Sequence, residues 1–76
     1  MNKVYIRLKC LSNNRVYEVI FDKRLSFKEN LGLLSKIIGI NLEDKYVYDY
    51  KRNLFLNMEM PIDRFNIGIF PMFELL

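Results

Sequence analysis

Few side chains in this sequence are suited to catalysis. It has no histidine, and Cys10 is its only cysteine. These counts exclude a Cys/His zinc site, an intramolecular disulfide and any catalytic dyad or triad that needs imidazole. Apolar residues alternate with polar ones over residues 4–10, which assigns Cys10 to the buried face of a strand. We therefore expect an inert thiol rather than a nucleophile.

The carboxylates and glycines give no stronger signal for a reaction. Asp44, Asp49, Glu59 and Asp63 are scattered along the chain, and we interpret them as solubilising charges rather than as an acid–base pair. Three glycines do not make a Gly-rich phosphate loop. The sequence predicts a protein that is not an enzyme and that has no catalytic, metal or cofactor site.

The residues best suited to binding alternate along the first predicted strand. Tyr5, Arg7 and Lys9 lie on the face opposite to the buried residues. The last strand is expected to add outward-facing Met72 and Leu76 beside them. Aromatic and basic side chains interleaved on a sheet can stack on bases and contact phosphates. The same alternation also occurs on any antiparallel sheet with one solvated face.

Three interpretations of this surface are open: a merely solvated face, a protein interface and a nucleic-acid interface. A mixture of aromatic, basic and apolar side chains is typical of protein interfaces. Twelve Lys and Arg against nine Asp and Glu give a net charge of +3, which is weak for nucleic-acid binding. We therefore favour a protein partner, keep nucleic acid as the alternative, and leave a homo-oligomer open. Val16 and Ile20, on the outer face of the second strand, would extend the surface.

The elements that position these residues begin with a hairpin and a helix. Strands are predicted over residues 4–10 and 16–21, joined by an Asn-rich turn at 12–15. Ser26 and Glu29 form a capping box, and Gly39 stands where a helix C-terminal glycine is expected, which predicts a helix over residues 27–38. Its apolar stripe is widened by Leu33 and Ile37.

The second half of the chain is predicted to be mostly strand. Strands are expected over residues 45–50, 54–56 and 72–76, with a tight turn or 3₁₀ segment within 61–67. In the first of these, three tyrosines share one face and Val47 and Asp49 share the other. Because a buried carboxylate is costly, we expect the tyrosine face to lie at least partly inward.

This order of elements predicts one α+β domain spanning residues 1–76. One helix is available to cover one face of a mixed sheet of about four to five strands. The last strand should lie centrally and parallel to the first, because the helix lies in the long crossover between hairpins. The opposite face of the sheet then stays open.

The order and length of the elements resemble ubiquitin and the β-grasp fold. The capped helix with its Gly39-Ile40 exit, the stretch Ile62–Ile67 and the final Phe73–Leu76 are similar to the corresponding parts of ubiquitin. The chain is more similar still to small bacterial ubiquitin-like proteins of the YukD/EsaB type. That resemblance implies a cytosolic accessory protein of type VII secretion in Gram-positive bacteria. The sequence departs from the family at Phe70-Pro71, where a Gly-Asp pair is usual, and at Phe65, which lacks a hydroxyl.

The ends of the chain carry further expectations. Conjugated ubiquitin-like proteins and sulfur carriers of this fold need a terminal Gly-Gly, whereas this sequence has no Gly-Gly and ends at Leu75-Leu76. We therefore expect neither conjugation nor sulfur transfer. The N-terminal residues lack the apolar run of a signal peptide, and no run approaches the length of a membrane helix. With a single unpaired cysteine, a cytoplasmic location without membrane insertion is expected.

Overall fold

The computed structural model describes residues 2–76 and contains the predicted elements in the predicted order. The helix has the bounds expected from its capping signals, whereas the third strand is shorter than expected. The elements are β1 (Lys3–Cys10), β2 (Arg15–Asp22), α1 (Phe27–Ile38), β3 (Val47–Asp49), β4 (Leu54–Phe55), the 3₁₀ turn η1 (Ile62–Arg64) and β5 (Met72–Leu75).

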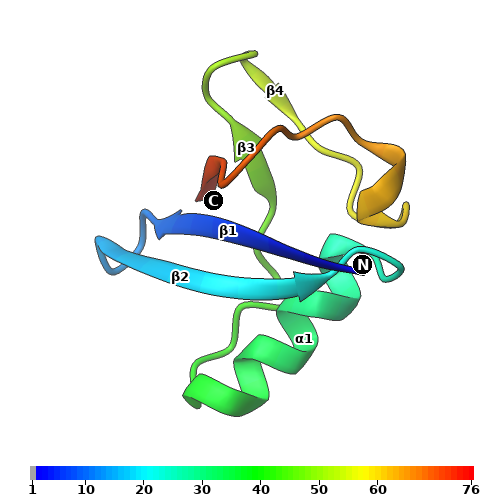
Figure 1. Ribbon diagram of the computed structural model, residues 1–76. Coiled ribbons are helices and arrows are strands. Elements are labelled where there is room, and N and C mark those ends of the chain that lie inside the picture. Colours follow the sequence, from blue (N-terminus) through cyan, green and yellow to red (C-terminus); the bar gives the residue numbers. More distant parts are fainter. Residues whose placement is uncertain (1) are drawn as a thin grey trace.

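The five strands form one mixed sheet with the order β2-β1-β5-β3-β4. β5 lies in the centre and pairs in parallel with β1, while the other neighbouring strands are antiparallel. This confirms the predicted central position of the last strand. Figure 1 shows α1 on one side of the hairpin formed by β1 and β2. β3 and β4 lie beyond the edge of β1 that does not pair with β2. One face of the sheet is therefore covered by the helix and the other is not.

Local signals explain where the hairpin turns and where the helix starts and stops. Asn14 has a positive φ of 57°, a conformation that Asn tolerates in turns. The Ser26 Oγ accepts a hydrogen bond from the Glu29 amide at 3.0 Å, and the Ser26 amide donates to the Glu29 carboxylate at 3.1 Å. Gly39 ends the helix with a φ of 72°, which a residue without Cβ adopts at no steric cost.

The core lies between α1 and the sheet and is built around Phe27. The Phe27 ring packs against Phe21, Phe65 and Phe73, with ring centroids 6.0–6.3 Å apart. Cys10 is only 1% exposed and belongs to this core, as its place in the alternation predicts. The other buried apolar residues are Ile6, Leu8, Leu31, Leu34, Leu42, Val47, Leu56, Ile62 and Leu75.

The structure reverses the predicted orientation of the third strand. Val47 is fully buried and Asp49 is 7% exposed, so the tyrosines face outward. The cost of burying Asp49 is offset locally. Its Oδ1 accepts hydrogen bonds from the Lys51 and Arg52 amides at 3.1 and 3.3 Å, and its Oδ2 lies 3.6 Å from the Arg52 Nε. Asp49 thus closes the turn into β4, and a hydrogen-bonded buried carboxylate is tolerated.

The apolar stripe of the helix is narrower than predicted. Leu31 and Leu34 pack into the core, but Leu33 is 51% exposed and Ile37 is 81% exposed. Both residues lie on the flank of α1 that is nearest to β2, and they share a shallow groove with Val19. The two aliphatic side chains thus form an exposed apolar area on the helix.

The end of β2 is fastened to the helix by a buried asparagine. The Asn30 Oδ1 accepts from the Asp22 amide at 2.9 Å, and the Asn30 Nδ2 donates to the Asp22 carbonyl at 3.0 Å and to the Ser26 carbonyl at 2.9 Å. The first two bonds imitate the pair that a neighbouring strand would make. Asn30 therefore takes the place of a strand at this point of the sheet edge.

Candidate interaction surface

The five predicted binding residues all lie on the face of the sheet that α1 leaves open. Tyr5 is 62% exposed and Leu76 is also exposed, whereas Arg7, Lys9 and Met72 are half-buried. Each of them belongs to β1 or β5 or directly follows β5, and each alternates with a core residue on its strand. The two central strands thus hold these side chains on one side of a rigid sheet.

The strand register divides these residues into two groups. Tyr5, Arg7 and Met72 form the first group, and Lys9 and Leu76 lie farther along the strands in the second. Met72 lies opposite Arg7, and Leu75 lies opposite Cys10 at the far end of β1 from Tyr5. At about 3.3 Å per residue, Leu76 and Tyr5 are roughly 20 Å apart. The expectation of one cluster containing both residues is therefore wrong. The parallel register, which no local signal specifies, separates them along the strand.

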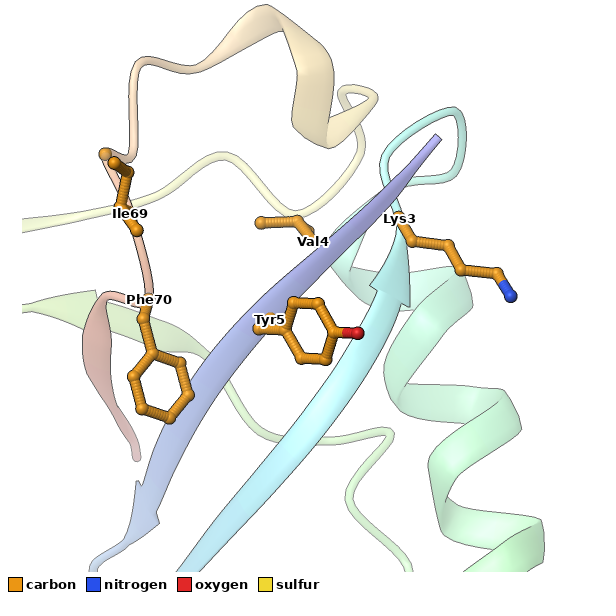
Figure 2. A pocket seen from close by; sticks show the side chains of 6 residues that line it. Lys3, Val4, Tyr5, Ile69 and Phe70 are labelled. Carbon is orange, nitrogen blue, oxygen red and sulfur yellow. The ribbon is translucent and has the colours of Figure 1, made fainter. Parts of the chain in front are cut away.

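The first group borders an apolar groove between β1 and the loop that precedes β5. The groove has a volume of about 530 Å³ and is lined by Lys3, Val4, Tyr5, Gly68, Ile69 and Phe70. Figure 2 shows the rings of Tyr5 and Phe70 beside the groove, Ile69 on the adjoining loop, and Lys3 extending away from them. Ile69 is 99% exposed. A smaller hollow on the other side of Tyr5 continues the apolar surface to Ile20 on β2.

Arg7 holds the loop side of this groove in place. Its Nη2 donates to the Phe70 carbonyl at 3.0 Å, and its guanidinium carbon lies 4.4 Å from the centroid of the Phe70 ring. Phe70 has a φ of 47°, which is unusual for a residue with a bulky side chain. Such a backbone conformation persists where neighbouring contacts enforce it. Arg7 is therefore a positioning residue: its hydrogen bond and its cation–π contact both hold Phe70 in place.

Leu76 belongs to an aromatic patch that is made of Tyr46, which precedes β3, Tyr48 on β3, Phe55 on β4 and Leu76, which follows β5. The Phe55 ring lies 6.4 Å from Tyr46 and 4.9 Å from Tyr48, centroid to centroid. Leu76 and Tyr46 exchange backbone hydrogen bonds of 3.0 and 2.9 Å, so their side chains are neighbours on the open face. Sequence reasoning missed the aromatic members, because it placed the tyrosines inward.

Sequence reasoning also missed Ile69 and Phe70. The pair Phe70-Pro71 stands out in the sequence as a departure from the related proteins, and this was the only available signal. Whether a loop side chain lies on the open face depends on the left-handed turns at Gly68 and Phe70, with φ of 74° and 47°. The turn at Phe70 is held by contacts with Arg7, which is distant in sequence.

Charges of both signs alternate on the open face. In the strand register, Arg7 lies opposite Glu18 on β2, and Lys9 lies opposite Glu74 on β5. Each basic residue predicted to bind thus has a carboxylate on the adjoining strand. The face consequently presents no continuous basic stripe, although the net charge of the chain is positive.

A strong pKa effect occurs at the end of β2, away from these two groups. Hydrogen bonds from the Arg24 guanidinium and amide lower the pKa of Asp22 from its ordinary value of 3.8 to about 2. The carboxylate and the guanidinium lie at the surface, 2.8 Å apart. This pair organises the turn between β2 and α1 and does not resemble a catalytic arrangement.

Two further findings concern residues 2–76. Within this range, no group of three or more Cys, Asp or Glu side chains is arranged to hold a metal ion. No helix in the same range is long and apolar enough to cross a membrane.

Comparison with known proteins places the fold. A protein designed de novo on the basis of ubiquitin matches with a TM-score of 0.74 and 17% identity, over 99% of this chain and 88% of its own. The ubiquitin-like domain of Plasmodium falciparum Dsk2 matches with a TM-score of 0.73 and 8% identity, over 96% and 95%. A structure named "Molecular Mimicry of SUMO promotes DNA repair" has a TM-score of 0.82 and 8% identity, over 100% and 92%. The fold is the ubiquitin-like β-grasp.

The comparisons establish the ubiquitin-like fold and not a finer family. No family description matches the sequence, and no curated protein matches it either. At identities below 20%, the solved structures carry no residue-level assignment to this chain. The resemblance to the secretion-associated YukD/EsaB type therefore stays a prediction, whereas the predicted α+β architecture is confirmed.

Proposed function

We propose that this protein is a non-catalytic, ubiquitin-like interaction module that binds a protein partner non-covalently through the open face of its sheet. The apolar groove between Tyr5 and the Ile69-Phe70 loop is the observation that carries the proposal. A completely exposed isoleucine beside two aromatic rings is a poor arrangement for contact with water. It is a good arrangement for burial in an interface, where aromatic anchors contribute most of the binding energy.

The finer proposal concerns the partner and the location. The sequence resemblance supports a cytosolic accessory role in type VII secretion, with a cytosolic part of the membrane-embedded machine as the partner. Such a role needs an exposed docking surface on a small stable domain and no chemistry. The groove and the aromatic patch provide two exposed apolar areas on one rigid face.

Nucleic acid is the weaker alternative for the same face. Arg7 is engaged with Phe70, and carboxylates lie opposite both Arg7 and Lys9. Single-strand binding would need basic groups that follow a phosphate backbone between stacking aromatic side chains. The mixed charge of this face favours a protein surface instead.

Site-specific photo-crosslinking in the native cell tests the proposal. A photoreactive phenylalanine analogue at position 5 should yield a defined crosslinked protein, which mass spectrometry identifies. Ile69→Asp should abolish the adduct because it places a charge in the interface. Ile37→Asp is the matched control, since Ile37 is 81% exposed on the helix, outside both surfaces, and the change should leave the adduct intact.

Two results would overturn the proposal. One is the absence of any protein adduct from position 5. The other is tight binding of a fluorescent single-stranded oligonucleotide that weakens steeply as salt rises, which is the signature of phosphate contacts. An adduct with a protein outside any secretion machine would retain the interaction module and reject its secretion role.

Arg7→Lys separates positioning from charge. Lysine keeps the positive charge but cannot reproduce the planar stacking and the directed bond to Phe70. If Arg7 acts by holding the loop, crosslinking at position 5 falls in this variant. Unchanged crosslinking would show that charge alone matters.

A further inference from the structure

The sheet has a gap between the first part of β1 and the loop that precedes β5. The two strands pair only from Arg7 and Met72 onward. If their parallel register continued backward, Phe70 would lie opposite Tyr5. The left-handed backbone at Gly68 and Phe70, with φ of 74° and 47°, diverts the loop from that course. The apolar groove beside Tyr5 therefore lies where a continued β5 would run.

Pro71 explains why the pairing stops at this point. The Arg7 amide donates to the Pro71 carbonyl at 2.9 Å, so the parallel ladder directs the Pro71 nitrogen at the Tyr5 carbonyl. A proline nitrogen carries no hydrogen and cannot donate. The Tyr5 carbonyl consequently receives no hydrogen bond from this position, and strand pairing begins at Met72.

The edge of β1 that borders the groove has free backbone groups. The Lys23 amide donates to the Asn2 carbonyl, which fixes the even-numbered residues of β1 as those bonded to β2. Lys3 and Tyr5 therefore direct their N–H and C=O groups toward the groove. Within residues 2–76, these groups have no hydrogen-bond partner. Such an edge can accept another strand.

The side chains around this edge are mostly apolar. Val4, Tyr5, Ile69 and Phe70 line the groove, and Figure 2 shows the Val4 side chain between β1 and the loop. Water is a poor occupant of such a place, because it finds few polar side chains there. A peptide segment can bond to the backbone of β1 and cover the apolar side chains at the same time.

Lys3 supplies a positive charge at one end of the groove. The carboxylate opposite it in the strand register belongs to Asp22, whose Oδ2 lies 2.8 Å from the Arg24 Nη2. Because Arg24 holds this carboxylate, the Lys3 ammonium stays available for a carboxylate of a partner. An occupant that complements the groove is therefore apolar with an acidic residue at the Lys3 end.

We propose that the groove binds an extended segment of the protein partner, which adds a short strand antiparallel to β1 along Lys3–Tyr5. This inference rests on the function proposed above and specifies how the partner is held. The segment carries a large aliphatic residue opposite Tyr5, a small residue opposite Val4 and an acidic residue opposite Lys3. The aliphatic side chain then lies on the open face, beside the rings of Tyr5 and Phe70.

The pattern of free groups selects the antiparallel direction. In an antiparallel pair, a residue opposite Tyr5 exchanges both backbone bonds with it, and a residue opposite Lys3 does the same. A segment of about three residues then satisfies the whole edge. In a parallel pair, a residue opposite Val4 would bond only to the Lys3 carbonyl and the Tyr5 amide. The remaining groups would require a longer segment, which Pro71 obstructs beyond Tyr5.

Amide NMR with a synthetic peptide tests this binding mode. The probe is the blocked pentapeptide Ser-Ile-Ala-Glu-Ser, which has the proposed pattern in the antiparallel direction. At millimolar concentration it should shift the Lys3 and Tyr5 amide signals of the full chain and slow their hydrogen exchange. The Val4 amide is bonded to β2 and should keep its exchange rate. Unchanged Lys3 and Tyr5 amides would overturn the proposal.

Two changes to the probe separate strand pairing from simple apolar contact. N-methylation of its isoleucine removes the N–H that donates to the Tyr5 carbonyl and should weaken binding by about tenfold or more. N-methylation of its alanine is the matched control, because that N–H points away from β1 and the affinity should stay unchanged. Equal affinity of the two methylated probes would show that no strand is added.

A charge exchange tests the direction of the segment. Replacing the probe glutamate with lysine should weaken binding to wild type, and Lys3→Glu should restore it. Lys3 is exposed, so this variant should fold normally. Failure of Lys3→Glu to restore binding would refute the antiparallel direction. A protein adduct at position 5 without any response of the Lys3 and Tyr5 amides would retain the interaction module and reject the added strand.

Discussion

Replacing Asn30 with alanine should destabilise the protein far more than an average polar substitution on a helix. Asn30 is 4% exposed, and its amide makes three hydrogen bonds of 2.9–3.0 Å to the backbone of Asp22 and Ser26. Alanine removes all three. The Asp22 and Ser26 carbonyls keep other donors, from Leu25 and from the residue-30 amide, but the Asp22 amide loses its acceptor.

The magnitude follows from these contacts. Each bond contributes about 0.5–1.5 kcal/mol to stability, and an amide left without a partner lies at the upper end of that range or above it. Alanine regains about 0.5 kcal/mol, because it forms helix more readily than asparagine. The free energy of unfolding should therefore fall by about 2–3 kcal/mol.

Urea unfolding followed by circular dichroism measures this change. Lys28→Ala is the matched control on the same helix, where the ion pair with Glu59 is exposed and the free energy of unfolding should change by less than about 0.5 kcal/mol. Hydrogen exchange adds a local readout, since the Asp22 amide should lose its protection in Asn30→Ala. An Asn30→Ala protein as stable as the control, with a protected Asp22 amide, would refute the view that Asn30 closes the sheet edge.

Two further predictions concern the cysteine and the acid side of the stability curve. Cys10 should react with a thiol reagent only as urea unfolds the chain, because it is 1% exposed, and rapid labelling of the native protein would contradict this. The Asp22 carboxyl should titrate near pH 2 by NMR, and Arg24→Ala should move its pKa back toward 3.8. Because the pKa is lowered on folding, the contribution of this pair to stability is present above the unfolded pKa and is lost as the pH falls from about 4 toward 2; an unshifted wild-type pKa would exclude it.

The elements that were predictable from sequence are those with local signals. The helix bounds follow from Ser26, Glu29 and Gly39, each of which acts within a few residues of itself. The burial of Cys10 follows from strict alternation in one strand. The central position of β5 follows from the length of the crossover connection, which is a rule of topology rather than of individual residues.

The errors arose where contacts outside the strand itself decide the outcome. Asp49 is buried because two amides beyond the strand and Arg52 satisfy it, so the cost assumed for an isolated carboxylate does not apply. Tyr5 and Leu76 lie far apart because the parallel register places Met72 opposite Arg7 and Leu75 opposite Cys10. Phe70 enters the open face through a turn enforced by Arg7. Alternation in single strands contains none of this information.

The two-residue strand β4 has a consequence for how far association can proceed. The sheet has two ends, β2 and β4, and they are not alike. A polymer that grows by edge pairing needs an accepting strand at both ends of every subunit. β4 spans only Leu54–Phe55 and is too short to hold an incoming chain in register. Edge pairing at β2 alone therefore cannot propagate into a polymer, which protects this apolar, strand-rich domain from fibril formation.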